Sequence, residues 1–453
     1  MIHGPFAIAL ARAVHDSRPD DVPLLMAGAL RAGEPWKEVC AEVLRTSGQC
    51  VDFTGGRNIH GVLSLIASAR LGQQVPAEQA LLPIGQAVAY VAGQPKWKQP
   101  PRWVEAGSKD DAHRDEFDLA TAIAINAARE DPALVEEAVR ALVHQASHFG
   151  GNWGHALIFA TMTYDAGAMF GWEVVAPLFA VAVEHIIPSD RDEAAHEAAW
   201  TRFEKGHLDF SAIAKAPPSR KGEEEGGSLR RAMRRATLEE AATTVGSALE
   251  RGVSVEVLTD ALALAGADKM MRTSYSMSAA HSLTFAHAVR RAIAIQRDGC
   301  TIGAIAGAAA FMGSQVEVYD RRAEGSRAGK SQTPVPSPET FERLLREGPV
   351  ADAVEGAQAV AQAGRTREPA YLAAVVRAAS TDDLILSNGI NLKHAEAALS
   401  EEAAVHGGDK STFLMAVAKN ICASERGADL HDKLLHAAAG RVKVQRVEGA
   451  LHR

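Results

Sequence analysis

Hydrophobic residues recur along most of the chain at spacings of three and four positions, which is the pattern of amphipathic helices. Such patterns begin at Leu24, again at Val62 and later at Leu258. Runs of β-branched residues in strict alternation, which would indicate strands, are nearly absent. The pattern therefore predicts an all-α protein with at least about two-thirds of its residues in helices.

Glycine and proline residues mark the ends of the predicted helices. Gly48, Gly72 and the turn Gly93-Gln94-Pro95 lie about 20 to 25 residues apart, which suits antiparallel helices joined by short turns. No sharp repeat is present, which argues against a regular TPR or ankyrin array. We expect a large array of antiparallel helical hairpins that share one core.

Two polar segments interrupt the helical pattern. Residues 216–228 combine charges with Gly and Pro, and residues 320–340 contain several Gly and Pro residues. Segments of this kind are linkers or flexible loops, so we expect them to be the most mobile parts of the chain. They divide the sequence into an N-terminal block 1–215, a central block 229–319 and a C-terminal block 341–453, which we expect to form one continuous fold.

Composition and charge narrow the class of protein. The chain is 47% hydrophobic and 23% charged, which is typical of globular proteins. Its formal net charge of −8 argues against a nucleic-acid partner, because phosphate contacts need clustered Lys and Arg. The most apolar stretch, 299–313, is too short to span a bilayer, and the N-terminus lacks the basic region of a signal peptide. We therefore expect a cytoplasmic protein without a membrane partner.

Common catalytic and metal-binding motifs do not fit this sequence. Residues 325–331 resemble a phosphate-binding loop, but the spacing is one residue short and the segment is rich in Pro. The cysteines form no CxxC pair, so they indicate a reducing compartment rather than a zinc framework. The four cysteines are Cys40, Cys50, Cys300 and Cys422.

One histidine pair has the spacing of a zinc protease. His144 and His148 lie four residues apart, on one face of a predicted helix. Gln145 stands where that motif requires a general-base Glu, and an amide cannot accept the proton. A zinc hydrolase elsewhere in the chain would need a Glu beside its ligands, and Glu184 is the only adjacent candidate.

Several histidines lie inside apolar helical runs, where an unpartnered imidazole is costly. Taken singly, each is more simply interpreted as a satisfied core residue. One pair is favoured by geometry: His155 and His185 each lie about 15 residues from the turn between their two helices, so an antiparallel hairpin would place both at the same end. His281 and His287 are six residues apart and therefore point in different directions. His60 also opens an apolar run.

Four segments resemble the questin oxidase-like family. Residues 155–164 are similar to its HPLIH-LGY segment, and residues 281–284 to its HAVT segment. Residues 58–65 resemble its early His-containing helix, and residues 392–395 its late Lys-containing helix. The order and the wide spacing of these segments agree across most of the chain.

The resemblance implies an all-helical oxygenase that uses iron(II) and O₂ to oxidise an aromatic, polyketide-type small molecule. It implies that the metal is held by histidines and by a carboxylated lysine. A buried lysine has a depressed pKa, so its neutral amine can accept CO₂ and become an anionic oxygen ligand. The hairpin geometry adds His185 as the fourth histidine ligand, and His148 is the alternative for that position. The expected ligands are His60, His155, His185, His281 and Lys393.

Two interpretations of the function follow. Ala156 and Phe159 replace the Pro and the second His of the family segment, which leaves open the substrate and the choice between ring cleavage and Baeyer–Villiger insertion. The alternative to an oxygenase is a helical scaffold for protein interactions, with the histidines as core residues. Only 5% of the sequence is aromatic, which disfavours the aromatic binding face that such a scaffold needs. Bound metal in the purified protein separates the two interpretations.

Overall fold

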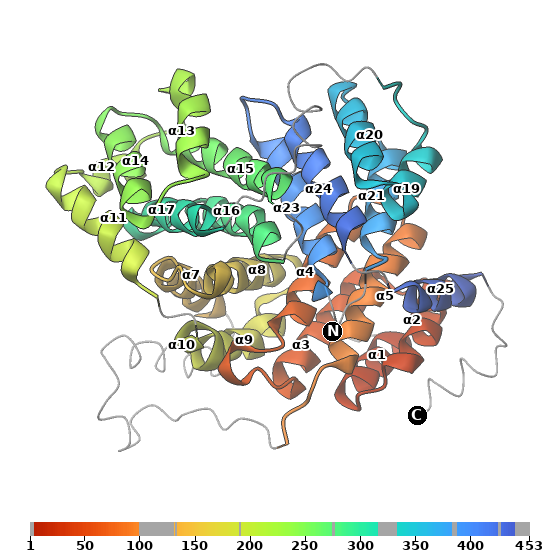
Figure 1. Ribbon diagram of the computed structural model, residues 1–453. Helices are drawn as coiled ribbons and strands as arrows, with labels where there is room; N and C mark the ends of the chain where they lie inside the picture. The colour runs from red at the N-terminus through yellow and green to blue at the C-terminus, as the bar shows by residue number, and fades with distance from the viewer. Residues whose placement is uncertain are drawn as a thin grey trace. The chain divides into compact units, whose positions relative to one another are not determined.

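The computed structural model describes residues 4–98, 131, 134–189, 192–273, 277–315, 333–382, 387–424 and 427–439 (Figure 1). The protein is 78% helical, and these residues include no strand. Val51 and Lys96 form an isolated antiparallel bridge. The all-α prediction is therefore confirmed.

Contacts within the chain group it into two compact units. Unit 1 consists of residues 1–143, 159–189 and 428–453, and unit 2 consists of residues 144–158 and 190–427. The division of the sequence into three blocks that form one continuous fold stays a prediction, as does the hairpin arrangement of the helices.

Among the described residues, unit 1 is built mainly on five helices from the first part of the chain, to which the segment 159–189 and α25 are added. The adjacent helices α4 and α5 pack together, and a partly buried ion pair joins Arg70 to Asp165 at 2.6 Å. Its helices are α1 (Pro5–His15), α2 (Val22–Ala32), α3 (Trp36–Cys50), α4 (Ile59–Gly72), α5 (Ala77–Gly93), most of α7 (Val135–Ala146) and of α8 (His155–Phe170), α9 (Trp172–Val181), α10 (Ile187–Ser189) and α25 (Ala428–Ala438), with the short turns η1 (Pro19–Asp21), η2 (Thr54–Gly56) and η6 (Ala182–Ile186).

One stretch of unit 1 is apolar and long enough to cross a membrane. It runs from Trp172 to Ser189 with a mean hydropathy of 1.3, and half of it is buried inside the protein. A core helix passes the same test of length and composition, and this stretch also carries Glu184 and His185.

Unit 2 contains the two longest helices among the described residues, α15 and α16. The helices α15, α16 and α17 lie side by side (Figure 1). Its helices are α11 (Ala194–Lys205), α12 (Phe210–Lys215), α13 (Gly226–Met233), α14 (Leu238–Glu250), α15 (Val255–Arg272), α16 (Met277–Ile295), α17 (Gly299–Ser314), α19 (Pro338–Glu347), α20 (Val350–Gln362), α21 (Pro369–Ala379), α23 (Ile390–Ala404) and α24 (Ser411–Ala423), with the short turns η5 (Asn152–Gly154) and η7 (Glu223–Glu225).

A glycine lets α15 and α16 approach each other closely. A Cβ atom at Gly266 would stand 2.7 Å from the carbonyl oxygen of Ser282 and 3.0 Å from the Cα of Leu283. These distances are shorter than van der Waals contact, so no larger residue fits without moving a helix. The contact fixes the backbone of α16 directly after His281.

A buried ion cluster joins α15, α16 and α23. Glu401 is fully buried and accepts hydrogen bonds from His287 Nδ1 at 2.8 Å and from Arg290 Nε at 2.7 Å. Arg290 also donates to Asp260 at 2.9 Å. Buried charges are tolerated when they are paired and hydrogen-bonded in this way.

The segment 216–228, which was expected to be a linker or flexible loop, makes specific contacts with other parts of unit 2, and its mobility stays a prediction. Arg220 pairs with Asp260 at 2.6 Å, and the backbone of Ser254 donates to the Lys221 carbonyl at 2.9 Å. Helix α13 already begins at Gly226. The sequence pattern misses this because it shows the charges of the segment but not their partners. Of the second expected loop, residues 320–332 lie outside the described residues.

Candidate metal centre

Three of the five predicted ligands, His155, His281 and Lys393, belong to unit 2. His60 and His185 belong to unit 1. His60 is the half-buried second residue of α4. His185 lies in the π-helical turn η6 with its ring 5.2 Å from that of Trp97, and burial lowers its pKa. That these two residues join the other three at one metal stays a prediction.

His155 and His281 meet in the core of unit 2. Their Nε2 atoms are 3.0 Å apart, their ring planes are nearly perpendicular, and the exposed fractions of the two residues are 5% and 3%. Two nitrogens that bind one ion at about 2.1 Å each, with a nitrogen–metal–nitrogen angle of about 90°, are also about 3.0 Å apart. The separation of the two Nε2 atoms therefore fits two ligands of one metal. The same distance fits an N–H···N hydrogen bond in the metal-free protein.

A strained turn sets the position of His155. Asn152, Trp153 and Gly154 all have positive φ, at 38°, 66° and 75°, directly before α8 begins at His155. A Cβ at Gly154 would lie 2.5 Å from the ring of Phe285 in α16, so the turn sits tightly against that helix. The Trp153 ring packs 5.9 Å from the His155 ring and 5.1 Å from the His281 ring.

A backbone carbonyl sets the orientation of His281. Its Nδ1–H donates to the Met277 carbonyl at 2.6 Å, so the Nε2 of the neutral ring carries a lone pair directed at His155. Burial, together with the charge of Lys393, lowers the pKa of His281 to about 3, and burial also holds the pKa of His155 well below its ordinary value. Both rings are therefore neutral at pH 7, which is the state in which imidazole binds metals.

Lys393 on α23 is buried close enough to influence both rings. Its exposed fraction is 5%, and its Nζ donates to the Asn388 carbonyl at 3.1 Å. Burial lowers the pKa of Lys393 to about 7, although the charge of Asp382 opposes the shift. A large part of this lysine is therefore a neutral amine near pH 7, which is able to accept CO₂.

His394, the next residue on α23, was not among the predicted ligands. It is completely buried, and neither ring nitrogen has a hydrogen-bond partner among the described residues. Burial lowers its pKa to about 4, and a charge on His394 would act on His281. Its position directly after Lys393 in an apolar segment is the feature of the sequence that could have identified His394 as a candidate ligand. An unpartnered buried imidazole is costly unless a further group binds it.

Sequence reasoning also missed a second cluster, formed by His144, His148 and Cys300. One nitrogen of each histidine and the Cys300 sulfur lie within 4.8 Å of one another. The interpretation that the cysteines do not make a zinc framework considered only cysteine–cysteine spacing. Cys300 follows His148 by 152 residues, so only the folded chain brings them together.

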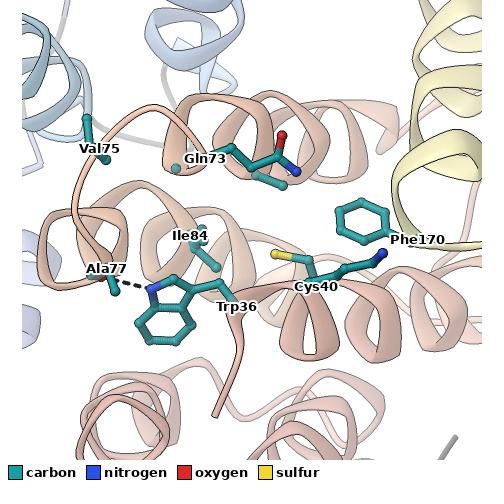
Figure 2. Close-up of a pocket in the computed structure, with 10 residues that line it drawn as sticks. Trp36, Cys40, Gln73, Val75, Ala77, Ile84 and Phe170 are labelled. Carbon is teal, nitrogen blue, oxygen red and sulfur yellow. Dashed lines mark hydrogen bonds between the residues drawn. The ribbon is translucent and has the colours of Figure 1, made fainter. Parts of the chain in front are cut away.

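A pocket of about 230 Å³ lies in unit 1 between α3, α4 and α5. Figure 2 shows the Trp36 ring at one side of the pocket, which Gln73, Cys40 and Phe170 also line. The Nε1–H of Trp36 donates to the Ala77 carbonyl at 2.8 Å. Pockets for drug-sized ligands measure about 300–1,000 Å³, so this one is small for a polycyclic aromatic molecule.

The residues of unit 2 fit a metal that prefers nitrogen ligands. His155 and His281 are close, buried and neutral, the second nitrogen of His281 is fixed by a carbonyl, and a neutral lysine is nearby. No family model, no curated protein and no solved structure matches this chain. The resemblance to the questin oxidase-like family therefore remains an expectation.

Proposed function

We propose that this protein is an iron-dependent oxygenase that uses O₂ to oxidise an aromatic, polyketide-type small molecule. The observation that supports it most is the pair of Nε2 atoms of His155 and His281, 3.0 Å apart in a buried site. Iron(II) at such a site supplies the activation of O₂, which reacts slowly with most organic molecules by itself. The choice of substrate rests on the resemblance of four segments to the questin oxidase-like family.

The residues of the chain itself have three roles in this proposal. His155 and His281 bind the iron, and the Met277 carbonyl holds His281 in the tautomer whose Nε2 is free of hydrogen. The neutral amine of Lys393 adds CO₂, which forms a nitrogen–carbon bond, releases one proton and yields an anionic oxygen ligand. Burial keeps bulk water away from these groups. His60 and His185 complete the proposed ligand set.

The metal content of protein prepared without a histidine tag tests the proposal. We expect the wild type, after anaerobic loading with iron(II), to retain iron, and His155→Ala and His281→Ala to lose most of it while remaining helical by circular dichroism. His406→Ala, which removes an exposed histidine of unit 2, serves as the matched control and keeps its iron. Iron-loaded wild type should also consume O₂ when a hydroxylated anthraquinone is added.

A wild-type protein that retains no iron under these conditions overturns the proposal. In that case the two imidazoles form an ordinary core hydrogen bond, and the helical scaffold becomes the better interpretation. Retention of iron without O₂ uptake on any aromatic substrate overturns the oxygenase assignment alone.

A further inference from the structure

The second histidine cluster contains a sulfur and has an orienting carboxylate of its own. His148 Nε2 lies 3.1 Å from the Cys300 sulfur. His144 Nδ1–H donates to Asp298 at 2.7 Å, which leaves His144 Nε2 as the nitrogen that faces the same sulfur. A carboxylate that accepts from the outer nitrogen of a ligating histidine is a regular feature of zinc sites.

Local structure explains why these three side chains meet. His144 is in the last turn of α7, and His148 follows one turn later, so their rings lie 5.4 Å apart. Cys300 is the second residue of α17, whose N-cap Asp298 accepts a hydrogen bond from the backbone of Thr301. Asp298 therefore has two functions, because one carboxylate oxygen caps the helix and the other orients His144.

The cluster opens into a hollow on one side. The hollow is lined by His148, His196, Glu197, Trp200, Thr201 and Cys300. The His196 ring is stacked on that of His148 at 4.1 Å, and its Nδ1 has no hydrogen-bond partner in the part of the chain that the structure describes. Three donors with one open side match the zinc sites that bind water or a substrate, whereas structural zinc sites have four protein ligands.

We propose that His144, His148 and Cys300 form a second metal site, which binds Zn²⁺ or a similar divalent ion through two imidazole nitrogens and one thiolate and keeps a fourth position open to the hollow. The donor set suits zinc and cobalt, and is too soft for magnesium or calcium. A thiol nucleophile, the other use of such a cysteine, needs one histidine as its base. Here two imidazoles converge on the same sulfur, which favours the metal.

The ligand class for the open position follows from the walls of the hollow. Glu197 offers a carboxylate that can accept a proton from a metal-bound water, and Trp200 offers an apolar surface that is partly exposed. The open position therefore suits water or a small polar molecule with an aromatic or apolar part.

Cobalt(II) titration of the metal-free full-length protein tests the second site. Cobalt bound to a thiolate gives a sulfur-to-cobalt charge-transfer band, which the nitrogen ligands of the His155–His281 site cannot produce. We expect the band in the wild type and in His281→Ala, and its loss in Cys300→Ser. Cys422→Ser is the matched control, since Cys422 is a half-buried thiol near the Leu345 carbonyl, and this variant keeps the band.

Asp298→Asn tests the orienting role separately from folding. Asparagine still caps a helix well, but it does not provide the carboxylate for His144. We expect about 10- to 100-fold weaker cobalt binding with unchanged helical content. Unchanged affinity would contradict the role of Asp298 as a positioning residue.

Alkylation of Cys300 distinguishes the metal site from a thiol nucleophile. With zinc at about ten times its Kd, only about one molecule in eleven is metal-free, so iodoacetamide should modify Cys300 about tenfold more slowly. An equal rate with and without zinc, or a cobalt band that survives in Cys300→Ser, overturns the second site. Neither result bears on iron at His155 and His281.

Discussion

At the scale of single residues, the burial of the Lys393 ammonium group carries a clear cost to the fold. Its ammonium form is disfavoured in the core, which is why the pKa of this lysine falls from 10.5 to about 7. A methionine has a similar length and no charge, so it removes this cost but cannot bind CO₂ or a metal. The site therefore keeps a destabilising residue that the proposed chemistry needs.

We predict that Lys393→Met stabilises the metal-free protein and that the effect depends on pH. The folded pKa of Lys393 lies below the unfolded one, so the cost is absent above about pH 10.5 and fully present below about pH 7. As the pH rises between these limits, the free energy of unfolding of the wild type should approach that of the variant by about 1.4 kcal/mol per pH unit. Urea unfolding of both proteins at several pH values measures the difference. A stability difference that stays constant with pH would contradict the claim that a protonated Lys393 destabilises the folded protein. Iron retained by Lys393→Met would exclude Lys393 as a ligand.

At the scale of helices, the contact at Gly266 links packing to the metal site. We predict that Gly266→Ala destabilises the protein by about 1–3 kcal/mol, because the added methyl group meets the backbone of Ser282 and Leu283. The displaced α16 carries His281, so iron binding should weaken as well. Gly226→Ala, at the start of α13 with no atom within 4 Å of the added Cβ, is the control and should be neutral. Thermal unfolding and iron titration of both variants measure these effects. Equal stability and equal iron affinity of the two variants would contradict the prediction.

A second prediction at this scale concerns the ion cluster of α15, α16 and α23. Burial raises the pKa of Glu401, but the charges of Arg290 and His287 outweigh this and bring it below its ordinary value. Glu401→Gln should therefore cost about 3 kcal/mol at neutral pH, since Arg290 then keeps the carboxylate of Asp260 and the hydroxyl of Thr259 but loses the charge of Glu401.

The pH dependence of this effect has a definite sign. The contribution of Glu401 is fully present above the ordinary carboxyl pKa of about 4.3 and is lost as the pH falls through the lower folded pKa. Urea unfolding of wild type and variant should thus converge in acid. A variant that is as stable as the wild type at pH 7 would show that the cluster contributes nothing.

At the scale of the whole molecule, periodicity predicted the fold class but could not predict which distant residues meet. The spacings that begin at Leu24, Val62 and Leu258 reflect the local geometry of helices, so they predict helices reliably. His155 and His281 are 126 residues apart, and they were paired by a resemblance in the order of segments rather than by any spacing. Cys300 had neither signal, because it lies at a helix start whose neighbour is defined only by packing.

Because α15 and α16 touch through Gly266, the protein should tolerate smaller residues at its helix contacts better than larger ones. Both cores rely on alanine and glycine at helix contacts. The last turn of α17 is tighter still, since a Cβ at Gly313 would lie 1.7 Å from the Ala236 carbonyl oxygen. Removing a methyl group from such a contact costs about 1 kcal/mol, through lower helix propensity and lost packing, whereas adding one forces two backbones apart. At the crossings marked by Gly266 and Gly313, residue size therefore limits substitution before side-chain chemistry does.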